Sequence, residues 1–438
     1  MMMMRQPTTQ LLLAAVLMAA VAGCKDGGET PPGETRTVRP PPAMGGANVW
    51  RAMRVRPQAQ TATQIQAGPA HLALIRTFLD SSDSAERAGI AQSLQEEIGA
   101  VATSRAIPKA VEFSSFPGRL VEGEVGRDAQ GRQLYLAVLP KDYDPSRPWP
   151  LHIDLHGGGR AGTHMTCLKH WGTSPGPFIV LCPTTFKGHW WLAQGEAMAM
   201  KVFSDALEHF NIDTDRVSVG GLSNGGNGTW HLGHKYPWLW SALVPRCAGH
   251  IHGFEYITNI MGVPVFMIHG EADSTIGVDH SRRMFSEFEA RGRTITYKEV
   301  EGGGHAFFPS LNADVLPWLM RQKRQTPARF AFVPTRGQDH GIIHWLEAEG
   351  ARELRAELSE GPDGVHINVV TKGTLKHLRV YLNESMVDPE QRVVVVHNKR
   401  QLFSGLAEHD AAVALETFER TRDPKRTFTA RIDLPLSP

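Results

Sequence analysis

The first candidate for a reactive residue in this chain is a serine in a glycine-rich turn, Gly221-Leu-Ser-Asn-Gly225. The apolar, β-branched stretch Arg216–Gly220 precedes the turn and predicts a strand, and a helix is expected to begin near Asn224. Glycines permit a turn sharp enough to lift a serine hydroxyl clear of a sheet, and the start of a helix favours developing negative charge. The spacing predicts Ser223 as a nucleophile, and a structural turn with an idle serine is the alternative.

A serine hydroxyl needs a base, and the base needs a carboxylate that orients it. Two later turns offer these groups in the chain order serine, acid, histidine. The strand expected at Val265–His269 runs into a turn that contains Asp273, and the next strand ends in Glu301-Gly-Gly-Gly-His305. We therefore expect Asp273 and His305 to complete a catalytic triad with Ser223, and Glu271 is an alternative acid.

Stabilisation of an oxyanion is the remaining requirement of such a site. The strand predicted at Leu151–Leu155 ends in His156-Gly-Gly-Gly159. A glycine turn of this kind supplies one backbone N–H donor, and the residue after the nucleophile supplies the second. We expect Gly157 or Gly158, together with Asn224, to be these donors; a plain turn between strand and helix is the alternative.

Residues that follow other predicted strands are candidates for the walls of a substrate pocket. His156 begins the glycine turn, and Trp190 and Trp191 follow the strand predicted at Phe178–Cys182. An indole ring suits stacking on a sugar or a phenolic acyl group, and packing in the core or at the rim is an equal alternative. We expect these three residues, with His250, to border the site.

One further cluster has a composition that suits a metal ion. The segment Cys247-Ala-Gly-His250-Ile-His252 follows a predicted strand and supplies thiol and imidazole groups. Residues of these types also line ordinary pockets, and the chain lacks the H-E-x-x-H spacing of a zinc hydrolase. We therefore expect no metal and no cofactor.

The elements that position these residues alternate between strands and helices from residue 117 onward. A hairpin comes first, with strands at Arg119–Val125 and Gln133–Leu139 around a polar turn. Further strands are predicted at Phe178–Cys182, Ala242–Pro245 and Thr294–Val300, and helices at Glu196–Phe210, Asn224–Lys235, Val278–Ala290 and Leu311–Arg321. This alternation predicts a mostly parallel sheet covered on both faces, which is the α/β class.

These residues together resemble the α/β-hydrolase superfamily. Within it, Gly220–Trp230, Tyr236-Pro237 and Gly302–Ala306 look like the secreted esterases of the polyhydroxybutyrate depolymerase and feruloyl or acetylxylan esterase type, with related serine peptidases nearby. The resemblance covers residues 117–322. It implies the α/β-hydrolase fold and hydrolysis of a carboxylic ester through an acyl-serine. A peptidase of the prolyl-oligopeptidase type and a non-catalytic surface lipoprotein that binds a glycan or polymer are the alternatives.

The N-terminus carries the signals of an exported lipoprotein. After Arg5, the apolar run Leu11–Ala22 has the length of a signal-peptide core and is too short to span a bilayer. The stretch Val21-Ala-Gly-Cys24 resembles a bacterial lipobox. The resemblance implies that residues 1–23 are removed and that Cys24 is lipidated, which anchors the protein in the cell envelope, at the outer membrane or cell surface. A plain signal peptide is the alternative.

The composition divides the rest of the chain into four parts. Residues 24–66 are rich in Pro, Gly and Thr and are expected to form a disordered tether. Residues 67–116 predict a helical extension of two helices, separated by Asp80-Ser-Ser-Asp83. Residues 117–325 form the expected catalytic domain, and residues 326–438 predict a small antiparallel β domain of the sandwich type.

The charge and the cysteines set limits on partners and cross-links. Among 438 residues, 46 basic and 45 acidic side chains give a net charge of +1, so we expect no nucleic-acid partner. The expected partners are an ester substrate and, through Cys24, a membrane. At most one internal disulfide can form among Cys167, Cys182 and Cys247, and their spacing does not say which pair joins.

Overall fold

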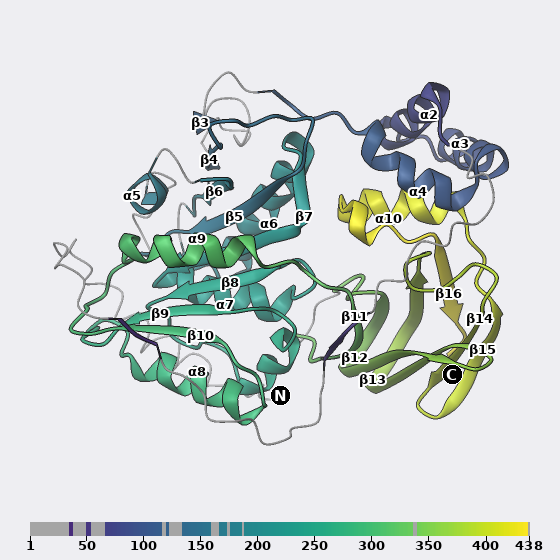
Figure 1. Ribbon diagram of the computed structural model, residues 1–438. Helices are drawn as coiled ribbons and strands as arrows, with labels where there is room; N and C mark the ends of the chain where they lie inside the picture. The colour runs from purple at the N-terminus through teal and green to yellow at the C-terminus, as the bar shows by residue number, and fades with distance from the viewer. Residues whose placement is uncertain are drawn as a thin grey trace, which may run out of the picture.

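The computed structural model describes residues 35–37, 50–53, 66–115, 120–121, 134–158, 166–172, 176–185, 188–335 and 340–436. The expected signal peptide, the lipidation site Cys24 and most of the expected tether lie outside these residues. Two sheets organise the described part of the chain, and Figure 1 shows them side by side. Among the described residues, none of the helices combines the length and apolarity needed to span a membrane.

The first sheet has nine strands in the order β1-β10-β9-β8-β7-β5-β6-β4-β3. Its strands are β1 Thr35–Thr37, β3 Leu120–Val121, β4 Tyr135–Val138, β5 Trp149–Leu155, β6 Ile179–Pro183, β7 Ile212–Leu222, β8 Ala242–Arg246, β9 Phe266–Gly270 and β10 Thr296–Val300. The neighbours from β6 to β10 pair in parallel, and β1, β3 and β4 add antiparallel pairs at the two edges. The predicted α/β class, with its mostly parallel sheet and its initial hairpin, is confirmed.

Helices cover both faces of this sheet. They are α5 Thr166–Trp171, α6 Ala193–His209, α7 Asn224–Lys235, α8 Asp279–Ala290 and α9 Asn312–Met320. Because successive residues of a strand point to opposite faces, Leu243 of β8 joins a core with α6, α7 and α8, whereas Ala242 and Val244 join a core with α9. Figure 1 shows α9 crossing in front of the sheet. Burial on both faces explains why these strands read as continuous apolar runs in the sequence.

The second sheet has seven strands and differs from the expected antiparallel domain. Its strands are β2 Arg51–Ala52, β11 Pro327–Phe332, β12 Leu346–Gly361, β13 Gly364–Leu382, β14 Arg392–His397, β15 Arg400–Leu406 and β16 Ala430–Leu434. The strands pair antiparallel as expected, except that β13 and β14 pair in parallel. The long pair β12 and β13 shifts register beside Gly350 and Gly373, both at positive φ.

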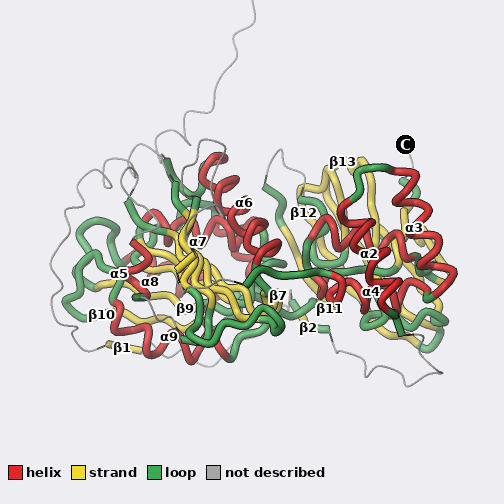
Figure 2. The backbone as a smooth tube through the Cα atoms, turned by 90° about the horizontal axis from the view of Figure 1, so that it is seen from above, coloured by secondary structure: helices red, strands yellow, loops and turns green. Residues whose placement is uncertain are grey.

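The N-terminal helices belong with this second sheet rather than with the first. They are α2 Pro69–Asp80, α3 Ser84–Glu97 and α4 Gly99–Ala110, and their apolar faces share a core with α10 Ala411–Thr421. Figure 2 shows them on the side of the molecule away from α5. The predicted break is present, because Asp83 caps α3 by accepting hydrogen bonds from the N–H groups of Ala85 and Glu86. A third helix, α4, was not predicted.

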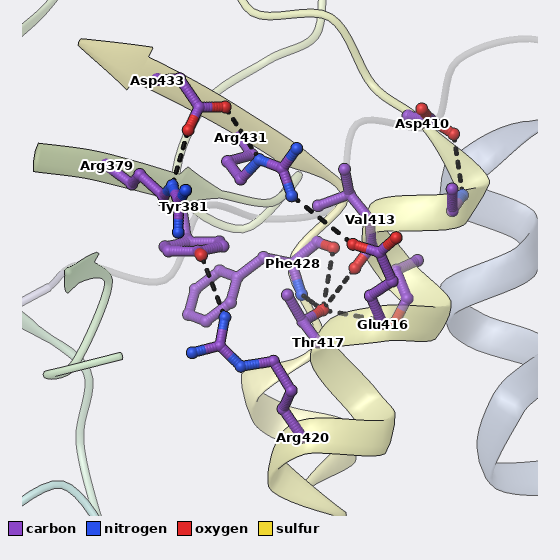
Figure 3. A network of polar contacts seen from close by, with 12 residues as sticks. Arg379, Tyr381, Asp410, Val413, Glu416, Thr417, Arg420, Phe428, Arg431 and Asp433 are labelled. Atoms are coloured by element: carbon purple, nitrogen blue, oxygen red, sulfur yellow. Dashed lines mark hydrogen bonds and ion pairs between the residues drawn. The ribbon is translucent and has the colours of Figure 1, made fainter. Parts of the chain in front are cut away.

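Helix α10 is fixed to the second sheet by polar contacts (Figure 3). The hydroxyl of Thr417 lies 3.2 Å from the carbonyl oxygen of Phe428 and accepts the N–H of the same residue at 3.0 Å. The guanidinium of Arg420 donates to the hydroxyl of Tyr381 at 3.2 Å. Sheet, α10 and the N-terminal helices therefore form one packed unit.

Several contacts join the two units, and one of them comes from the segment expected to form the tether. Trp50 packs against both cores, and β2 beside it pairs with β11, so residues 24–66 are not wholly without structure. A large indole supplies the apolar surface that the rest of that segment lacks. Another contact between the units is made by Arg324, whose guanidinium donates to Asp423 at 2.6 Å and to Asp215 at 3.0 Å.

Candidate active site

Ser223 lies in a strained turn between β7 and α7. Its φ of 57° and ψ of −115° are rare for a residue with a side chain. The turn passes so close to the end of β5 that a Cβ atom on Gly221 would lie 2.3 Å from the carbonyl oxygen of Leu155, and one on Gly225 only 1.8 Å from it. The two glycines therefore allow the close approach that holds the serine at the carboxyl end of the sheet.

Asp273 and His305 meet as the sequence predicted. The Nδ1–H of His305 donates to Oδ2 of Asp273 at 2.7 Å, while Oδ1 accepts the N–H groups of Thr275 and Ile276 at 2.8 and 2.9 Å. Burial alone would raise the pKa of Asp273, but hydrogen bonds from His269 and His305 lower it well below its ordinary value. An ionised carboxylate holds the proton of the imidazole on Nδ1, which leaves a lone pair on Nε2.

The atoms that would exchange a proton are both buried. Among the described residues, Oγ of Ser223 and Nε2 of His305 have no hydrogen-bond partner, and they make no hydrogen bond with each other. In enzymes without substrate such contacts are often long and tighten in the Michaelis complex. A buried hydroxyl and a buried imidazole nitrogen without partners are costly, which is typical of reacting groups rather than of structural ones.

The alternative acid, Glu271, lies elsewhere. Its exposed carboxylate accepts the N–H of Gly302 at 3.1 Å. The backbone N–H of the next residue, Ala272, donates to the carbonyl oxygen of Gly303 at 2.8 Å. Glu271 therefore fastens the glycine turn before His305, and Asp273 is the carboxylate that contacts the imidazole.

A second histidine, which was not predicted, orients the acid. His269 is fully buried, and its Nε2–H donates to the carbonyl oxygen of Ile276 at 2.8 Å and lies 3.3 Å from Oδ2 of Asp273. Its Nδ1 accepts the hydroxyl of Ser281 at 2.7 Å. The signal was the position of His269 at the end of β9, four residues before the acid.

The thiol of Cys247 completes the surroundings of the acid. Cys247 is free and buried, and burial raises the pKa of its thiol to about 12. Ligand atoms of Cys247, His269 and Asp273 lie within 4.8 Å of one another. Asp273 and His269 use these atoms in hydrogen bonds with His305 and Ile276, so in this structure the set orients the acid. Cys182 is disulfide-bonded.

Arg246 connects the turn that carries Ser223 (the nucleophile turn, residues 221–225) to the loop that carries His305 (the histidine loop, residues 301–308). Its carbonyl oxygen accepts the N–H of Ser223 at 2.9 Å. Its buried guanidinium donates to the carbonyl oxygens of Phe307 and Phe308 at 2.8 and 3.4 Å and to Oδ1 of Asn312 at 2.7 Å. Burial lowers the pKa of Arg246 to about 10, which still leaves it charged at neutral pH. The sequence signal for this role was a charged residue at the end of a buried strand.

The expected oxyanion donors lie around Ser223. A Cβ atom on Gly157 would lie 3.5 Å from Cβ of Ser223, so this glycine faces the nucleophile directly. Asn224 is the first residue of α7, where backbone N–H groups have no partner within the helix. Its side chain donates to the carbonyl oxygen of Gly158 at 3.0 Å and ties the two expected donor segments together.

Two of the expected pocket residues instead support the glycine turn. Trp190 is fully buried, and its Nε1–H donates to the carbonyl oxygen of His156 at 2.9 Å. The ring of His156 accepts the N–H of Thr185 at 3.1 Å through Nε2 and donates through Nδ1 to the carbonyl oxygen of Gly157 at 3.0 Å. The contacts of Trp190 match the alternative expected for it, packing in the core, where the indole supports the glycine turn.

The remaining pocket candidates differ in their positions. Trp191 is partly exposed and stacks on His189, with 4.4 Å between ring centroids. Nδ1 of His189 lies 3.3 Å from Oδ1 of Asn224, so these rings are at the edge of the site. His250 stacks on Phe254 instead.

A separate cavity of about 360 Å³ lies away from these residues. It is lined by Phe210, Asn211 and Ile212 at the opposite end of β7 and by residues of α2 and α10. The cavity therefore belongs to the junction of the two units rather than to the site around Ser223.

Comparison with known proteins gives partial matches. No protein-family profile matches the chain. An uncharacterized secreted protein of Arthroderma benhamiae is 27% identical over 44% of this chain and 25% of its own length, and a bifunctional acetylxylan esterase/xylanase of Neocallimastix patriciarum is 28% identical over 33% and 22%. The chain thus spans about a quarter of the length of these relatives. A thermostable esterase structure superimposes with a TM-score of 0.40 and 24% identity over 47% of this chain and 64% of its own.

Proposed function

We propose that the protein is a serine hydrolase that cleaves carboxylic esters through an acyl-serine intermediate. One observation carries the proposal: His305 is held by Asp273 at 2.7 Å, while Nε2 of His305 and the hydroxyl of Ser223 are both buried and have no hydrogen-bond partner in the part of the chain that the structure describes. The strained position of that hydroxyl, at the carboxyl end of a parallel sheet and the start of a helix, supports the same role.

The reaction follows from the positions of these groups. Ser223 attacks the ester carbonyl while Nε2 of His305 takes the hydroxyl proton, and Asp273 stabilises the imidazolium that forms. The N–H groups of Asn224 and of Gly157 or Gly158 stabilise the oxyanion. The imidazolium then protonates the leaving alcohol, and a water molecule activated by the same base hydrolyses the acyl-serine.

The substrate class that we propose is an ester of a plant polysaccharide or a related polyester. The name of the relative from Neocallimastix patriciarum, an acetylxylan esterase/xylanase, supports acetylated xylan as a substrate to test. The stacked rings of His189 and Trp191 beside Asn224 supply a flat apolar surface of the kind that packs on sugar or phenolic rings.

A substrate panel tests the proposed activity. Acetylated xylan, feruloyl esters, polyhydroxybutyrate and p-nitrophenyl acetate are compared with an amino-acyl p-nitroanilide, with Ser223→Ala as the control. We expect at least one ester to turn over faster than the anilide and Ser223→Ala to abolish that turnover. Faster cleavage of the anilide contradicts the proposed esterase activity, and equal ester turnover by Ser223→Ala contradicts the proposed nucleophile.

We also propose that the protein is anchored in a bacterial cell envelope by a lipid at Cys24. The lipobox-like stretch that ends at Cys24 supports this proposal. A labelled fatty acid fed to a bacterial host is expected to enter the full-length protein and not its Cys24→Ala variant. Labelling that survives the substitution contradicts the anchor.

A further inference from the structure

Four histidines lie close together near the C-terminal end of α7, the end away from Ser223. His231 and His234 are three residues apart on α7 and so share one helix face, and His250 and His252 lie on the loop that follows β8. Ring centroids are 5.0 Å apart for His231 and His252, 5.9 Å for His234 and His252, and 5.6 Å for His234 and His250. Two imidazoles bound to one tetrahedral zinc through bonds of ~2.0–2.1 Å have centroids about 5 Å apart. The pair His231 and His252 has this spacing, and His234 lies farther away and must move closer to share an ion.

The hydrogen bonds of His231 leave a lone pair directed into this cluster. Its Nε2 lies 2.8 Å from Oε2 of Glu196, while Lys235 and Tyr236 donate to Oε1 of the same carboxylate. Because the ammonium of Lys235 and the hydroxyl of Tyr236 both donate to this carboxylate, the carboxylate acts as an acceptor toward His231 as well. His231 therefore donates through Nε2, and its Nδ1 lies 2.9 Å from Nε2 of His252. A carboxylate behind one imidazole nitrogen is the usual support of a metal-binding histidine.

The burial of the His234 imidazole is not explained by hydrogen bonds. The residue is 1% exposed, and neither of its ring nitrogens has a hydrogen-bond partner among the described residues. Nε2 of His250 beside it is also buried without a partner. Burying a polar nitrogen without a hydrogen bond costs ~1–3 kcal/mol, and a fully apolar ring would fit the same space without this cost.

We propose that His231, His234 and His252, with His250 beside them, form a binding site for a divalent first-row transition metal, with Zn²⁺ as the best match. Imidazole nitrogens are ligands that zinc, copper and nickel prefer. A bound ion replaces the contact between His231 and His252 and draws a nitrogen of His234 toward the pair. Such a site links the loop after β8 to α7 and stabilises the fold; it takes no part in the ester chemistry proposed for Ser223.

Metal binding to the tag-free, full-length protein tests the site. After removal of metals with EDTA, Zn²⁺ is titrated by calorimetry and Co²⁺ by its visible absorption. We expect one equivalent to bind, a tetrahedral Co²⁺ spectrum, and a rise of ~3 °C or more in the Tm at a hundredfold excess of Zn²⁺ over its Kd. Lack of stoichiometric binding by the wild type overturns the proposal.

The Zn²⁺ affinity of variants distinguishes binding at this cluster from binding to histidines elsewhere on the surface. His234→Phe keeps the ring volume, so the metal-free variant is expected to fold and to unfold at or above the wild-type temperature, while its Zn²⁺ affinity falls at least ~100-fold. His252→Asn is expected to lose binding as well, whereas the control His366→Ala, in β13, binds like the wild type. Unchanged Zn²⁺ binding by His234→Phe or His252→Asn overturns the proposal, as does equal loss in His366→Ala.

Discussion

Replacement of Asp273 by asparagine tests the geometry of the candidate site in depth. Oδ1 of Asp273 accepts two backbone N–H groups, from Thr275 and Ile276. An asparagine must keep its only oxygen at that turn, so its NH₂ group faces Nδ1 of His305 and the Nε2–H of His269. A donor in this position favours the tautomer of His305 that carries its proton on Nε2, and that nitrogen can no longer accept the proton of Ser223.

The expected loss of kcat is large because the substitution deprives His305 of its function as a base while the imidazole stays in place. A wrong tautomer lowers kcat by ~10⁴-fold in triads of this kind, about 5.5 kcal/mol of transition-state stabilisation, and leaves KM little changed. The assay is hydrolysis of p-nitrophenyl acetate, with kcat and KM measured separately. The variant is expected to stay folded, because asparagine has the same shape and keeps both turn hydrogen bonds.

Glu271→Gln is the matched control for this substitution. Glu271 is the other acid of the same loop, but its exposed carboxylate contacts the N–H of Gly302 rather than the imidazole. We expect Glu271→Gln to retain kcat within a few-fold of the wild type. Retention of activity within tenfold by Asp273→Asn, or a larger loss in Glu271→Gln than in Asp273→Asn, would refute the assigned geometry.

Three further substitutions test other contacts of the structure. Arg246→Met removes the link between the nucleophile turn and the histidine loop, so kcat is expected to fall by ~10²-fold with KM little affected, and Arg246→Lys to recover part of it. Asn224→Ala keeps the backbone N–H donor of this residue but removes the side-chain hydrogen bond to Gly158. We expect kcat to fall by ~10-fold, which is less than the ~10²–10³-fold loss caused by removal of an oxyanion donor. An unchanged kcat would show that this hydrogen bond is not needed. Burial would raise the pKa of Asp423, but Arg324 holds it below its ordinary value of 3.8. Its stabilising effect is therefore present above that pH and is lost as the pH falls further, so the difference in urea unfolding free energy between wild type and Asp423→Asn should shrink below pH ~4.

The strands of the first sheet could be predicted because burial on both faces leaves a simple signal. Strands such as Ala242–Arg246 and Phe266–Gly270 are apolar runs between turns, and their observed ends differ by one or two residues from the predicted ones. The chain order of serine, acid and histidine then placed Asp273 and His305 at one edge, where the structure joins them by a hydrogen bond. Their catalytic roles remain predictions.

The features that were missed depend on contacts between distant segments. Helix α10 packs on α2, α3 and α4, which are distant in the chain. Because these contacts stabilise the helix, the sequence of residues 411–421 alone was a weak signal for it. The exposure of Trp190 is likewise decided by the residues around it, and the roles of His269 and Arg246 depend on hydrogen bonds to residues distant in the chain or on neighbouring loops. Residue type and spacing predict which groups can react, but not which neighbours hold them.

The account depends most directly on the reactivity of one hydroxyl, which a fluorophosphonate probe measures. The probe forms a covalent bond with an activated serine, and mass spectrometry of the digested protein locates the adduct. We predict a single adduct on the peptide that contains Ser223, absent in Ser223→Ala and strongly slowed in His305→Ala. A folded protein that hydrolyses p-nitrophenyl acetate without an adduct at Ser223, or with the adduct on another serine, would contradict the account.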